Sequence, residues 1–142
     1  MARLKSTEIN GNLNIIGDLH IEDTTVADYI VEQGTDGIWT YRKWNSGIAE
    51  CWRITDSMDI DYDQEWYGLL YYTSLRQDFP SGLFTQVSNI SINTICAGGI
   101  HASSIQEFDT AHVVWYQVAH TGLAFPHYSY VRFNISVKGR WK

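Results

Sequence analysis

Apolar and polar residues alternate along much of the second half of the chain, with the period of a β-strand that has one covered face. The most regular run is the last one, in which every second position is apolar and the positions between are polar or charged. Its apolar positions are Val131, Phe133, Ile135 and Val137. Similar alternation covers residues 66–75, 83–95 and 107–119, with loops rich in Gly, Pro, Ser or Thr between them. The pattern predicts antiparallel strands.

Residues 38–43 and 48–53 are short runs rich in Trp, Tyr and Ile, and Asn-Ser-Gly lies between them at residues 45–47. Gly47 stands where a three-residue hairpin loop needs a positive φ, so the segment predicts a β-hairpin. Neither face of this hairpin is purely apolar. An Arg between aromatic rings can stack on them and form ion pairs across subunits, and the candidate interface residues are Trp39, Tyr41, Arg42, Trp44 and Trp52.

The N-terminal segment contains a repeat with a period of six residues, in which GNLNI is followed by GDLHI. So short a segment cannot bury its apolar side chains within one chain, whereas three copies wound about an axis can. The side chains that we expect to meet on the axis are Leu13, Ile15, Leu19 and Ile21. The alternative is an edge hairpin that turns at Asn10 and Gly11 and packs on the main domain.

These patterns predict an all-β protein, an antiparallel β-sandwich of about six strands with a short N-terminal trimeric stem and a β-hairpin. We expect a stem over residues 1–28, a hairpin collar over residues 29–55 and a sandwich head over residues 56–142. The sequence of residues 23–27 predicts a short helix or a linker.

Composition excludes several classes of protein. The net charge of -6 over 142 residues disfavours nucleic acid as a partner. No window of the sequence resembles a membrane span or the apolar part of a secretion signal, so we expect no membrane insertion. The two cysteines, far apart in sequence, predict reduced thiols rather than a disulfide or a zinc site.

We also expect no cofactor, no metal and no catalysis. The alternating carboxylates of residues 59–63 begin like a calcium loop, but Gln64 and Leu70 stand where that loop needs Gly and Glu. The five histidines lack ligand spacing, although His20 in the repeat is a candidate for a metal on a three-fold axis. No nucleophile motif is present, and no pair of carboxylates stands out as a glycosidase would require.

Three segments resemble a domain at the C-terminal ends of tail and fibre proteins of phages and prophages of Gram-positive bacteria. They are DYIVEQGTDGIWTYRKWNSGIAECW at residues 28–52, FPSGLF at residues 79–84 and VKGRWK at residues 137–142. The resemblance implies a homotrimer, located in the virion, assembled in the cytoplasm of the bacterial host and acting in host adhesion. Other phage tail or virion proteins are its implied partners.

The second half of the chain also resembles the H-type lectins, six-stranded sandwiches that form trimers or hexamers of trimers and bind N-acetylgalactosamine-like sugars. In those lectins a Trp and its successor, seven and eight residues after a core Phe, line the sugar site. Trp115 and Tyr116 stand at that offset from Phe108, although the lectins have His where this chain has Tyr116. Aromatic rings stack on sugars and polar side chains bond their hydroxyls. The candidate saccharide-binding residues are Asp109, Trp115, Tyr116, His120, His127, Tyr128 and Arg132.

Two functions remain open for this set. One is recognition of a host cell-surface saccharide without catalysis, in which Trp115 and Tyr116 contact the ligand. The other is a purely structural trimerisation or virion decoration domain, in which these rings pack in the core or between subunits. An exposed aromatic cluster on the head favours the first, and burial of every Trp favours the second. A depolymerase is a third alternative, which would need a carboxylate pair in a groove.

Overall fold

The computed structural model describes residues 28–97, 100–120 and 127–142, so the predicted stem with Leu13, Ile15, Leu19 and Ile21 lies outside the described residues. The described residues form strands and connecting turns without a helix, which confirms the all-β prediction. The strands are β1 (Ile30–Asp36), β2 (Trp39–Trp44), β3 (Ile48–Ile54), β4 (Met58–Asp61), β5 (Gln64–Trp66), β6 (Leu69–Asp78), β7 (Gln86–Ile95), β8 (His101–Phe108), β9 (His112–His120) and β10 (His127–Arg140).

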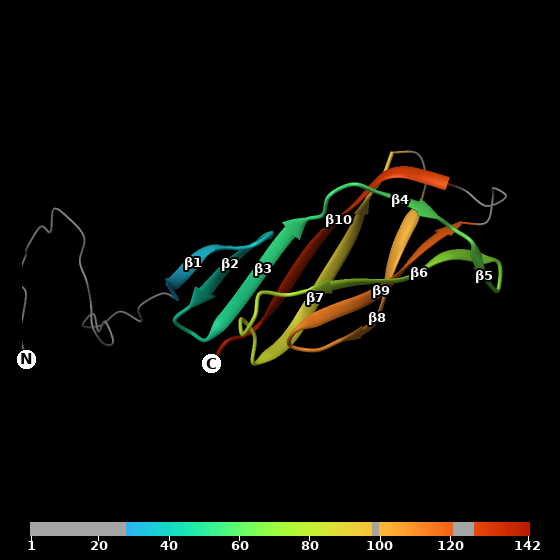
Figure 1. Cartoon of the computed structure of the whole chain (residues 1–142). Helices are drawn as coiled ribbons and strands as arrows, with labels where there is room; N and C mark the ends of the chain where they lie inside the picture. The colour runs from blue at the N-terminus through green and yellow to red at the C-terminus, as the bar shows by residue number, and fades with distance from the viewer. Residues whose placement is uncertain (1–27, 98–99, 121–126) are drawn as a thin grey trace, which may run out of the picture.

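The strands form two antiparallel sheets that pack face to face as a sandwich (Figure 1). The larger sheet has the order β1-β2-β3-β10-β4, with β7 also paired to β10, and the smaller has the order β5-β6-β9-β8. β1 and β5 lie at opposite ends of the molecule (Figure 1). The described chain starts near β1, so β5 lies at the end of the molecule far from that starting point.

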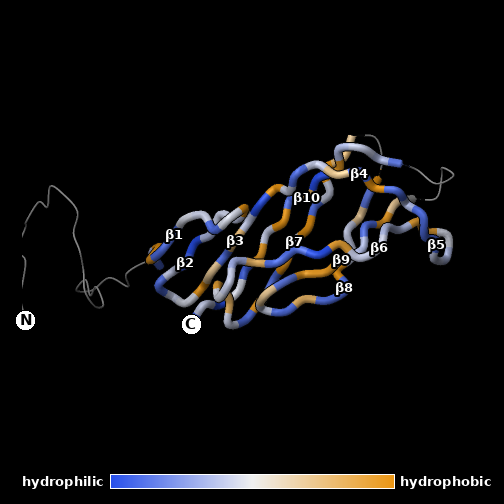
Figure 2. The backbone as a smooth tube through the Cα atoms, in the orientation of Figure 1, coloured by the Kyte–Doolittle hydropathy of each residue, from blue (hydrophilic) through white to orange (hydrophobic). Residues whose placement is uncertain are grey.

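β10 is the central strand, and its alternation is the one predicted. Val131, Phe133, Ile135 and Val137 are all buried, and the residues between them are exposed. β3 pairs with one edge of β10 and β7 with the other. Figure 2 shows hydrophobic and hydrophilic segments alternating along the strands, as expected where each strand has one face on the core.

The core joins both sheets. The rings of Trp115 on β9 and Phe133 on β10 meet edge to face, with centroids 5.3 Å apart. Gln117 and Thr55 are the buried polar residues of the described chain, and Gln117 has no exposed surface. Its side-chain oxygen accepts hydrogen bonds from Ser103 at 2.9 Å and Thr94 at 3.1 Å. These bonds offset the cost of burying an amide.

The predicted hairpin is present as β2 and β3, and Gly47 has φ +88° in its turn. It is part of the larger sheet, because β3 pairs with β10 from Ile48 to Ile54. Trp39, Ala49 and Cys51 of the hairpin belong to the core cluster. The expected collar and head therefore share one sheet and one core.

Two strand predictions differ from the structure. The run over residues 66–75 is interrupted by a tight turn at Tyr67 and Gly68, across which Trp66 pairs with Leu69. Alternation continues through a two-residue turn without a break in the sequence pattern, which is why the turn was not predicted. The small residues at 96–104 predicted a crossing segment, whereas His101 already begins β8.

Candidate functional site

The predicted saccharide set does not form one cluster. Asp109 lies in the β8–β9 turn, where its carboxylate accepts backbone N–H groups of Ala111 at 2.7 Å and His112 at 2.9 Å. These bonds lower the pKa of Asp109, the Ala111 bond most, and the nearby His112 adds to the effect. Asp109 is thus a turn-forming residue at the His112 end of β9. β9 is nine residues long, so its His120 end lies about 26 Å away at about 3.3 Å per residue.

The two aromatic candidates on β9 point in opposite directions. The ring of Trp115 is 2% exposed, so neither of its faces is available to a sugar in this chain. Tyr116 lies on the outer face of the smaller sheet, half-buried and edge to face with Tyr71 at 5.6 Å. Arg132 points away from the core on β10, opposite Ile95 of β7. The lectin-like pair of adjacent ligand-contacting rings is therefore not formed.

His127 and Tyr128 do come together with other aromatic residues. Tyr128 packs edge to face on His101, with ring centroids 4.5 Å apart, and His101 Nδ1 is 2.8 Å from the hydroxyl of Tyr62. Burial lowers the pKa of His101 and raises that of Tyr62 to about 12, so both groups are neutral near pH 7. The backbone of His120 pairs with that of Leu69 at the same end of the smaller sheet. The His120 side chain is not among the side chains that the structure describes.

This end of the molecule, formed by β4, β5, the Tyr67–Gly68 turn and residues 127–131, is here called the distal end because it lies farthest from β1 (Figure 1). It carries the most exposed aromatic side chains of the described chain. Trp66 is 65% exposed, Tyr67 is 93% exposed and Tyr130 is 78% exposed. None of the three belongs to the saccharide-binding set predicted from the sequence. The signal that could have found them is Tyr-Gly at 67–68, a dipeptide suited to a two-residue turn between paired strands.

His127 links three polar groups at the distal end. Its Nδ1 lies 2.6 Å from the Asp61 carboxylate and its Nε2 lies 3.0 Å from the Ser129 hydroxyl. The hydrogen bond to Asp61 raises the pKa of His127. The order Asp, His, Ser matches a proton relay, but all three residues are exposed, and such relays act in water-excluded sites. We interpret the group as a clamp between β4 and β10.

The distal end is strongly acidic. Between Ile54 and Leu75 the chain has five carboxylates and neither Lys nor Arg. The carboxylates are those of Asp56, Asp59, Asp61, Asp63 and Glu65, all of them exposed. Fixed negative charge around a surface repels anions and attracts cations.

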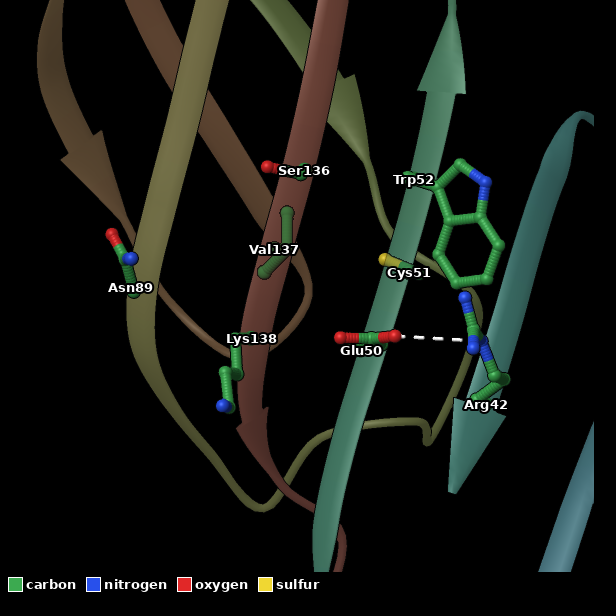
Figure 3. Close-up of a pocket in the computed structure, with 8 residues that line it drawn as sticks. All are labelled: Arg42, Glu50, Cys51, Trp52, Asn89, Ser136, Val137 and Lys138. Atoms are coloured by element: carbon green, nitrogen blue, oxygen red, sulfur yellow. Dashed lines mark ion pairs between the residues drawn. The ribbon is translucent and has the colours of Figure 1, made fainter. Parts of the chain in front are cut away.

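A second surface feature is a shallow groove of about 340 Å³ on the outer face of the larger sheet (Figure 3). The Arg42 guanidinium lies 4.6 Å from the ring centre of Trp52 and 5.7 Å from that of Trp44, and it pairs with Glu50 at 3.4 Å. Arg42 thus already has partners within its own chain. The groove is lined by Arg42, Glu50, Cys51, Trp52, Asn89, Ser136, Val137 and Lys138.

The other interface candidates have different positions. Trp39 is buried and donates its indole N–H to the Asp78 carbonyl at 2.8 Å, so it belongs to the core of its own chain. Tyr41 donates its hydroxyl to Glu32 at 2.7 Å. The Trp44 carbonyl accepts the indole N–H of Trp141 at 3.0 Å. Of the predicted interface residues, Tyr41, Arg42, Trp44 and Trp52 remain partly accessible.

Within the described residues, no three His, Cys, Asp or Glu side chains are grouped so that they could hold a metal ion. The same part of the chain has no helix that is long and apolar enough to cross a membrane.

The fold is similar to a solved tail-fibre structure. An N-truncated R1-type pyocin tail fibre, determined at 1.7 Å, aligns with a TM-score of 0.55 and 12% sequence identity over 80% of this chain and 86% of that one. No protein-family model matches the chain, and no curated protein matches it. At this identity the likeness defines the fold, so the chain has a tail-fibre-like β-sandwich fold.

Proposed function

We propose that the protein is a structural component of a phage or phage-like tail that binds a host cell-surface saccharide without catalysis. In this proposal it forms a homotrimer in the virion, with the stem of residues 1–28 leading to the rest of the tail. The tail-fibre-like fold supports the class of protein. The six-residue repeat supports the trimer, because one copy cannot bury its apolar side chains.

The exposed aromatic cluster at the distal end is the observation that carries the binding function. Trp66 and Tyr67 lie edge to face, with ring centroids 5.6 Å apart, on a turn that projects from the sandwich. Adjacent large rings that are exposed together form the kind of surface patch that marks an interaction site. Their place at the end opposite β1 is where a fibre joined to the tail at its N-terminus would meet a host surface.

Three chains would each present one such surface. A single shallow sugar site binds weakly, but three sites held rigidly together gain avidity because later binding events become intramolecular. Weak sites in a trimer therefore suffice for firm attachment to a repeating polysaccharide.

The second candidate function is a purely structural domain of the tail. The groove on the larger sheet and the partly accessible Tyr41, Arg42, Trp44 and Trp52 favour it, because they offer a surface on which another subunit could pack. This candidate does not explain why the distal rings are exposed at the free end.

The test is binding of the full-length protein to an array of purified bacterial capsular, cell-wall and lipopolysaccharide glycans. The proposal predicts saturable binding to at least one glycan, weakened when the chains are made monomeric. A protein that is trimeric and folded yet binds none of these glycans would favour the structural domain instead.

A further inference from the structure

Two tyrosines at the distal end have backbone conformations that tyrosine rarely adopts. Tyr67 has φ +46° and Tyr130 has φ +61°, and they are the non-glycine residues with positive φ in the described chain. In this region the Cβ atom crowds the backbone, so Gly, Asn and Asp are the usual residues. Strained residues of this kind concentrate at functional sites.

Packing within the chain does not account for these residues. Tyr67 is 93% and Tyr130 78% exposed, so little buried surface offsets the backbone strain. Tyr67 occupies the first position of the two-residue β5–β6 turn, where Asn would fit better, and Gly68 with φ +82° occupies the second. Tyr67 thus carries an aromatic ring where the fold favours a small polar residue.

A neighbouring ring orients Tyr67, and the backbone around Tyr130 is held to β4. Trp66 packs edge to face on Tyr67, and together they form a projecting pair. Tyr130 lies in the irregular stretch of β10 between Tyr128 and Val131. The neighbouring His127 ties this stretch to Asp61 on β4.

The charge of the distal end limits what these rings can bind. The five exposed carboxylates on and around β4 and β5 repel polyanions such as phosphate-bearing or uronate-rich polysaccharides. A neutral sugar meets no such barrier, and a sugar with a free amino group is attracted. The C–H face of a pyranose ring packs on an aromatic face, and neighbouring carboxylates accept hydrogen bonds from its hydroxyls.

We infer that Tyr67, with Trp66, is the ligand-binding site of the protein, and that the ligand is a neutral or amino-bearing glycan. This inference rests on the proposed function and adds the site and the ligand class. It replaces the predicted set around Trp115, of which His127 and Tyr128 lie elsewhere on the distal end.

The test is the variant Tyr67→Asn in the full-length protein, because Asn adopts positive φ more readily and removes the ring. We expect its melting temperature to rise by about 2–6 °C. We expect its binding to the glycans recognised by the wild type on the array to fall at least about tenfold. A merely structural tyrosine would not give this combination. Phe108→Thr, which removes a half-exposed ring near Asp109, is the control and should bind as the wild type does.

The outcomes separate the inference from the proposed function. Wild-type binding that Tyr67→Asn retains in full would overturn this site and leave the proposed function standing. Binding mainly to acidic polysaccharides would overturn the ligand class. A loss of trimer mass in Tyr67→Asn would place the ring between subunits and overturn the site. No wild-type binding to any glycan on the array would reject both.

Discussion

Gly139 provides a sharp test of the sheet that supports the distal end. A Cβ at this position would lie 2.1 Å from the Gln86 carbonyl oxygen and 2.9 Å from the Phe84 ring, whereas ordinary contacts begin near 3.4 Å. The backbone of β7 or β10 must therefore move by more than 1 Å to accept Gly139→Ala. Unlike the end of a flexible side chain, a backbone carbonyl in a sheet cannot swing aside.

The structure gives the magnitude of the effect. The Arg140 carbonyl accepts the backbone N–H of Thr85 at 2.7 Å and its hydroxyl at 3.1 Å, and the Lys138 carbonyl accepts the Ser88 hydroxyl at 3.0 Å. A shift of this size breaks all three hydrogen bonds. At about 1 kcal/mol each, the free energy of unfolding should fall by about 3 kcal/mol.

The assay is urea unfolding followed by tryptophan fluorescence, at equal chain concentration because assembly also affects stability. Gly34→Ala is the matched control: Gly34 also lies in a strand, and its Cβ would lie 3.5 Å from the Tyr41 hydroxyl without a positive φ. The free energy of unfolding of Gly34→Ala should be unchanged or higher by up to about 1 kcal/mol. Equal stabilities of the two variants would refute the described approach of β7 to β10.

Three further predictions follow from the assembly, the clamp and the core. Light scattering should give the full chain a mass near three times 16.3 kDa, and a monomeric full chain would contradict the trimer. The same measurement on residues 29–142 will show whether the sandwich assembles without the stem. NMR titration should place the pKa of His127 above its ordinary 6.5 and Asp61→Asn should return it toward that value, so the pair stabilises the fold below pH 6.5 and this stabilisation is lost as pH rises through the raised pKa. Gln117→Ala leaves the Thr94 hydroxyl without its amide partner and should lower the free energy of unfolding by about 2 kcal/mol in denaturant titration, whereas an unchanged value would contradict the buried network.

The sequence predicted the parts of the fold in which side-chain alternation follows burial. β10 is the clearest case, because Val131, Phe133, Ile135 and Val137 face a core on a strand paired on both edges. Gly47 was predictable for a different reason, since its turn needs a positive φ that glycine supplies.

The candidate site was less predictable because it depends on distance between segments. Asp109 and His127 are close in sequence, yet the length of β9 separates the turn of Asp109 from the distal end. Alternation places Trp115 on one face of β9 and Tyr116 on the other, but it does not tell which face is covered. The turn at Tyr67 was not predictable from the pattern, because apolar and polar residues alternate regularly through residues 66–75.

Hydrogen exchange of the full-length protein, with and without a glycan that it binds on the array, will show whether the distal end is the ligand-binding surface. We expect slower exchange of backbone amides in residues 58–69 and 127–131 when the glycan is bound, with no change at the β8–β9 turn. Slower exchange confined to the groove around Arg42 and Trp52 would contradict it.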